Sequence, residues 1–89
     1  MSNLDKERKN IQQIEKKGTD MMNKCKSKGE SLENLSHEVK LANDIINDLN
    51  KHTKKCPELK NTDSYQQAIA KFTQFKEAAE QKLQQKKAS

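Results

Sequence analysis

The sequence has few of the residues that build a compact core. Its 89 residues include no Trp, one Tyr and two Phe, and hydrophobic residues make up only 30%. A chain this polar cannot bury a large core by itself. We therefore expect an all-α protein: a long helix or coiled coil that completes its core with partners, or a thin helical hairpin. A chain that is disordered when alone is the alternative.

The sequence also lacks long apolar runs. No stretch approaches the ~18 consecutive apolar residues of a membrane span, and the charged N-terminus MSNLDKERKN shows no secretory signal. The two cysteines, Cys25 and Cys56, are too few for a disulfide framework. We expect a cytoplasmic protein with reduced thiols, and peripheral contact with membranes is the alternative.

Residues that carry chemistry are scarce as well. His37 and His52 have no paired nucleophile, no glycine-rich phosphate loop is present, and the two cysteines have no metal-ligand spacing. The lysines are dispersed, without aromatic residues between them in the first half of the chain. We therefore expect no enzymatic activity, cofactor, metal, small-molecule substrate or nucleic acid.

The net charge of +5 is unevenly distributed. Residues 1–50 hold nine Lys or Arg and nine Asp or Glu, whereas residues 51–89 hold nine Lys and four acidic residues. A lysine-rich face that is simply solvated is the more ordinary interpretation of such a block. The alternative is that the basic C-terminal half meets an acidic membrane surface or an acidic partner.

The single proline, Pro57, divides the chain. It opens the turn-rich segment PELKNTDS, and the residue before a proline usually leaves the helix. Asp63 can then cap a second helix, with Gln66 three residues later as in a capping box. The expected layout is a heptad helix within residues 1–56, a loop over 57–62, and a basic amphipathic helix and tail over 63–89.

The first segment carries a heptad seam. Counted from Leu4 in steps of three and four, sixteen positions contain twelve of the fifteen apolar residues between 4 and 56. A period of 3.5 held for more than seven heptads predicts a left-handed coiled coil. The expected contact residues are Leu4, Ile11, Ile14, Gly18, Met21, Cys25, Leu32, Leu35, Val39, Ala42, Ile46, Leu49 and Cys56, with Glu7, Lys28 and Thr53 as polar positions in the seam.

The seam keeps its phase through the stretch CKSKGESL, which favours a helix that is continuous in the assembled state. Gly18 and Gly29 each weaken such a helix by ~1 kcal/mol. The alternative is a helix–turn–helix with Ser31 as the N-cap of its second helix. On one continuous helix, Cys25 and Cys56 stand ~47 Å apart and cannot bond, so a disulfide between them requires a break near Gly29.

The C-terminal helix has a broader apolar stripe that holds all three aromatics of the chain. We expect it to fold back on residues 32–49. The alternative places its apolar face on a membrane, with its lysines near the headgroups. The stripe consists of Tyr65, Ala68, Ile69, Phe72, Phe75, Ala79 and Leu83.

Sixteen seam layers with a polar residue in the middle resemble the SNARE motif of membrane fusion. Lys28 has seven layers before it and eight after it, and the run Gly29-Glu30-Ser31-Leu32 resembles the Gly-Glu-x-Leu that often follows the central layer of that family. Gly18, eleven residues before Gly29, and the segment CPELKNTDSYQQA are similar to the first helix and linker of the synaptosome-associated SNAREs.

The resemblance implies a helix that joins a four-helix bundle with other SNAREs in vesicle docking and membrane fusion, or competes for such a bundle. Lys28 would be the central polar layer, which costs stability but sets the register. The chain departs from the family in having Lys instead of Gln at this layer, one cysteine in the linker and no second SNARE helix. A structural coiled-coil or bundle subunit that self-associates and is unrelated to fusion is the alternative.

Overall fold

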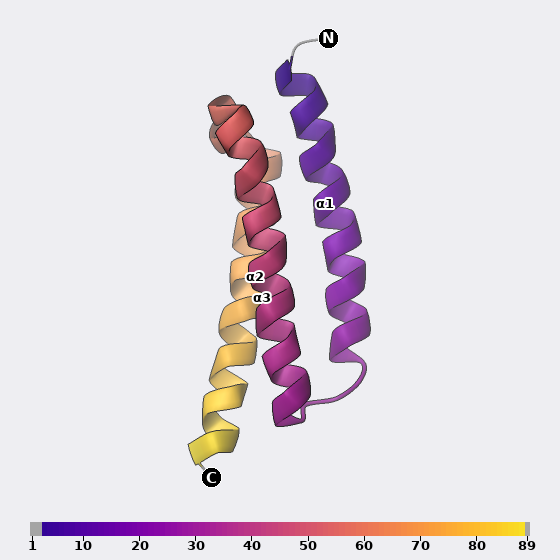
Figure 1. The fold of residues 1–89 in the computed structure, drawn as a ribbon, viewed down its shortest axis with the longest axis vertical. Coiled ribbons are helices and arrows are strands. Elements are labelled where there is room, and N and C mark those ends of the chain that lie inside the picture. Colours follow the sequence, from indigo (N-terminus) through magenta and orange to yellow (C-terminus); the bar gives the residue numbers. More distant parts are fainter. Residues whose placement is uncertain (1–2, 89) are drawn as a thin grey trace.

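The computed structural model describes residues 3–88, which form an antiparallel three-helix bundle with extents of 53 × 20 × 17 Å. Helix α1 spans Asn3–Lys26, α2 spans Leu32–Lys55 and α3 spans Asp63–Ala88, with a short 3-10 helix, η1, over Pro57–Asn61. Figure 1 shows the chain running down α1, back up α2 and down α3, so that the two termini lie at opposite ends. Within residues 3–88 there is no strand.

The continuous helix expected within residues 1–56 is not what the structure contains, because α1 stops at Lys26 and α2 starts at Leu32. Gly29 adopts a φ of 104°, in the left-handed region that L-residues with a side chain avoid. Ser31 is extended, and its side chain accepts a hydrogen bond from the Asn34 backbone N–H at 3.0 Å. The helix–turn–helix alternative, with Ser31 as N-cap, is therefore confirmed.

The chain turns between α1 and α2 because the turn buries apolar surface. A single helix of this composition exposes its whole apolar seam, whereas the turn lets α1 and α2 cover each other and pack on α3. The expected return of the C-terminal helix onto residues 32–49 is confirmed, because α2 and α3 pack along their lengths. The apolar face of α3 is thus turned toward the bundle, where Ala68, Phe72 and Ala79 are buried.

The core draws on both expected and unexpected positions. Phe72 is its largest fully buried side chain, and it packs among residues of α1 and α2. Met22 and Ile45 lie outside the heptad seam but are buried, because each helix turns a stripe of period near 3.6 toward two neighbours. The core cluster comprises Ile11, Met22, Ala42, Ile45, Leu49, Cys56, Leu59, Ala68 and Phe72.

Two boundary predictions need correction at the second connection. The segment expected as a loop forms η1, and its Leu59 is fully buried under the end of the bundle. The capping residue of α3 is Thr62 and not Asp63, because the Thr62 hydroxyl accepts a hydrogen bond from the Tyr65 N–H at 3.3 Å. Asp63 is the first residue of the helix, where a carboxylate suits the helix dipole.

Candidate interaction face

The residues expected in a coiled-coil interface divide between the core and the surface. The buried ones are Ile11, Gly18, Leu35, Ala42, Leu49 and Cys56, and the half-buried ones are Leu4, Ile14, Cys25, Val39 and Ile46. Met21 and Leu32 are 49% and 46% exposed, and Lys28 lies exposed in the turn. Lys28 is therefore not a buried polar layer in this fold, since the turn places it outside the seam.

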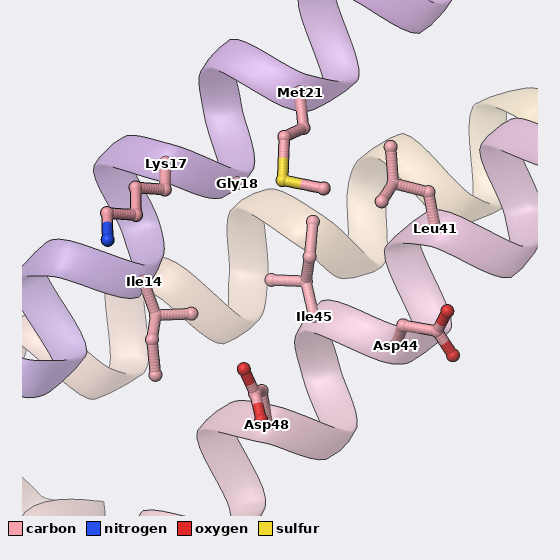
Figure 2. A pocket seen from close by; sticks show the side chains of 8 residues that line it. All are labelled: Ile14, Lys17, Gly18, Met21, Leu41, Asp44, Ile45 and Asp48. Atoms are coloured by element: carbon pink, nitrogen blue, oxygen red, sulfur yellow. The ribbon is translucent and has the colours of Figure 1, made fainter.

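A groove runs between α1 and α2 on a face that α3 does not cover. Its hollow has a volume of about 270 Å³ and is lined from α1 by Ile14, Lys17, Gly18 and Met21 and from α2 by Leu41, Asp44, Ile45 and Asp48. These positions recur at three- and four-residue steps on each helix, so they form a continuous stripe on each side of the groove. Figure 2 shows Met21 and Ile45 pointing toward each other from the two helices.

The floor and the lips of the groove differ in character. Gly18 and Ile45 are buried at the floor, where they meet Phe72 of α3, while Ile14 and Leu41 are half-buried on the slopes. Lys17 stands on the α1 lip, and Asp44 and Asp48 stand on the α2 lip. The groove is therefore an apolar trough with a positive edge on one helix and a negative edge on the other.

The charges on the lips have no ion-pair partner within residues 3–88. The ion pairs among residues 3–88 lie elsewhere: Glu7 with His52, Glu15 with Lys71, and Glu30 with Lys82. None of them involves Lys17, Asp44 or Asp48, each of which is exposed. The lips are thus free to meet charges of another helix.

A polar cluster closes the turn at one end of the bundle. The buried Asn34 side-chain amide donates to the Cys25 carbonyl at 2.8 Å and to the Gly29 carbonyl, so it caps the end of α1 and fastens the turn to α2. The Asn34 amide nitrogen also lies 3.4 Å from a carboxylate oxygen of Glu38. The role of Asn34 has no signature in the heptad pattern, because it depends on the turn that brings residue 34 against residue 25.

Burial affects the titration of the groups in this cluster. Desolvation raises the pKa of the Glu38 carboxyl, while the charges of Lys26 and Lys82 oppose the rise. Burial, followed by the nearby charge of Glu38, raises the pKa of the Cys25 thiol, and Lys28 opposes this. A thiol with a raised pKa is a weak nucleophile, so Cys25 behaves as a packing residue.

At the opposite end, Glu7 forms an ion pair with His52, which joins the start of α1 to the end of α2. The hydrogen bond from His52 holds the pKa of the Glu7 carboxyl below its ordinary value. The seam position of Glu7, polar in an apolar register, is explained by this partner on the neighbouring helix.

The two cysteines are free: Cys25 lies in the last turn of α1, beside the start of α2, and Cys56 follows the end of α2. Helix α2 has 24 residues and a helix of that length spans about 36 Å. The break near Gly29 that a disulfide between them would require is present, but it reverses the chain without bringing Cys56 back to Cys25.

The structure adds two further observations on function. No helix within residues 3–88 is long and apolar enough to cross a bilayer. Among these described residues, no three His, Cys, Asp or Glu side chains gather in a way that would hold a metal ion.

No protein-family model, curated protein or solved structure matches the chain.

Proposed function

We propose that the chain is a helical-bundle interaction module that assembles with other amphipathic helices through the α1–α2 groove. The observation that carries the proposal is the combination of an exposed apolar trough with unpaired charges on both lips. The charged residues of a surface helix are solvated. Met21, however, is 49% exposed and leaves apolar surface accessible to solvent beside Ile14 and Leu41. Such a patch rimmed by charges is typical of a protein interface.

A docked helix would complete a four-helix arrangement around this face. Helices pack about 8–10 Å apart with ridges in grooves, and the stripe of Ile14, Met21, Leu41 and Ile45 supplies apolar positions for that packing. A ligand helix with an apolar seam flanked by acidic residues on one side and basic residues on the other would satisfy both lips.

The experiment is an NMR titration of the isotopically labelled chain, at a dilute concentration, with a synthetic helix of heptad sequence. The matched control peptide has Ser in place of its seam Leu residues. We expect amide shifts confined to the groove, and we expect the variant Met21→Lys to abolish them. Shifts spread over α3, or equal shifts with the Ser peptide, would contradict a binding site in the groove.

The second candidate function is the SNARE-like one, in which the chain contributes a helix to a four-helix bundle with other SNAREs or competes for one. A specific feature favours it: the heptad phase continues across residues 27–31, although a turn leaves α1 and α2 free to have unrelated phases. A chain that straightens at this turn would recover a continuous seam with Lys28 at its centre. The exposed Leu32 and Lys28 are the residues whose surroundings would change most.

Distance measurement tests this second function. Fluorophores at Asp5 and Lys54 are at the same end of the hairpin, because α1 and α2 are antiparallel. In a continuous helix they would stand about 74 Å apart. We expect energy transfer to fall when purified SNARE helices are added; unchanged transfer with every SNARE combination would rule out opening and leave the groove-binding function in place.

A further inference from the structure

The arrangement of charges around the groove is self-complementary, which identifies an occupant. Lys17 lies on one lip and Asp44 and Asp48 lie on the other, and all three line the same hollow and so sit at one level along the bundle. We propose that the α1–α2 groove is a homodimer interface, with a second copy of this chain packed face to face against it. This inference rests on the proposed function and names its partner.

Symmetry decides how the two copies meet. Two grooves can face each other about a two-fold axis that runs along the groove or about one that runs across it. Rotation about the axis along the groove keeps every residue at its own level and places α1 of one copy over α2 of the other. Lys17 of each copy then stands opposite the Asp44 and Asp48 lip of the other copy.

The axis across the groove gives the opposite result. It places α1 over α1 and α2 over α2, so that like-charged lips face each other. Like charges across an interface disfavour association, whereas opposite charges steer it and set its register. The charge pattern therefore selects the axis along the groove.

The apolar residues fit the same arrangement. In the dimer, Ile14, Met21 and Leu41 of both copies would meet in the centre above the buried Ile45, with α3 of each copy on the outside. Met is enriched in interfaces because its flexible side chain fills irregular space. Helices α1 and α2 have 24 residues each, and elements about 36 Å long provide room for an interface of standard size.

The test is sedimentation equilibrium of the full chain from micromolar to millimolar concentration, with circular dichroism of every variant to confirm its helix content. We expect the wild type to dimerise and Met21→Lys to be monomeric with unchanged helix content. Lys17→Glu should raise the dissociation constant roughly tenfold or more. The matched control is Lys16→Glu, which makes the same charge change at an exposed position outside the groove, and it should leave the dimer intact.

Reversing the charges on both lips of the groove tests which two-fold axis relates the two copies. The triple variant Lys17→Glu, Asp44→Lys, Asp48→Lys should dimerise again, because it exchanges the signs of the two lips that face each other. A wild type that remains monomeric at every concentration would overturn the inference, whereas the peptide titration would still decide helix binding separately. A dimer that is insensitive to Met21→Lys, or a triple variant that stays monomeric, would also overturn it.

Discussion

Gly18 lies directly against the ring of Phe72. A Cβ atom added at residue 18 would stand 2.8 Å from Phe72 Cζ and 3.1 Å from Ile45 Cδ1. Separations under 3 Å between carbon atoms require something to move, so α1, α2 and α3 approach one another closely only because residue 18 has no side chain. The same glycine forms the floor of the groove.

Whether Gly18→Ala raises or lowers the free energy of unfolding tests the close packing at this residue. In a helix without this contact, Ala in place of Gly would stabilise by about 1 kcal/mol. In the bundle, overpacking against Phe72 costs about 1–3 kcal/mol, so we expect a net loss of about 1 kcal/mol in the free energy of unfolding by urea. Adding Phe72→Leu should make Gly18→Ala less costly than it is alone. A stabilised single variant would show that the close packing is absent.

Gly29→Ala tests the turn between α1 and α2. At a φ of 104°, an L-residue is strained, and we expect a loss of about 1–2 kcal/mol in unfolding free energy. Chemical synthesis with D-alanine at this position provides the control, because the D-residue favours positive φ. The Cβ of L-alanine would itself meet no atom within 4 Å, so the expected loss comes from the backbone conformation. If L-alanine instead stabilised the chain, residues 27–31 would have to be helical.

Asn34→Ala should destabilise the end of the bundle that holds the turn between α1 and α2. It removes the amide that donates to the carbonyls of Cys25 and Gly29, and the loss of two hydrogen bonds at about 0.5–1.5 kcal/mol each should cost about 1–3 kcal/mol. Urea unfolding measures the loss. Asn47→Ala, an exposed position on the same helix, is the control and should change stability by less than about 0.5 kcal/mol; equal losses at both positions would contradict the capping role.

Glu38→Gln should stabilise the protein near neutral pH. Burial raises the pKa of Glu38 above its ordinary 4.5, so the folded state prefers the neutral acid. The contribution of Glu38 to stability is therefore present below the ordinary pKa and is lost as pH rises through the raised one. Gln retains the acceptor that faces Asn34 without the charge.

The measurement is the melting temperature of wild type and Glu38→Gln across acid and neutral pH. We expect the variant to melt higher at neutral pH and the difference to vanish where Glu38 is protonated in both the folded and unfolded states. Glu77→Gln, at an exposed position of α3, should show no comparable gain. A difference that grows toward acid pH would contradict a raised Glu38 pKa in the folded state.

The heptad pattern was enough to predict an all-helical chain and the return of α3 onto α2, because apolar periodicity and the Pro57 break are local signals. It also contained the groove residues Ile14 and Met21. It was not enough to predict which seam residues are buried. The pattern treats Met21, Leu32, Ile11 and Leu35 alike, but Met21 and Leu32 are exposed in the structure whereas Ile11 and Leu35 are buried.

The sequence by itself determined the helices, the polar surface and the scarcity of catalytic groups, because these follow from composition and from spacing along the chain. Only the tertiary structure decided that residues 27–31 turn, that Asn34 caps α1 and that Phe72 occupies the space over Gly18. Each of these depends on contacts between residues far apart in sequence or on a backbone conformation, and a repeat of seven residues is compatible with both a straight and a folded helix. The groove and its oppositely charged lips arise from that fold.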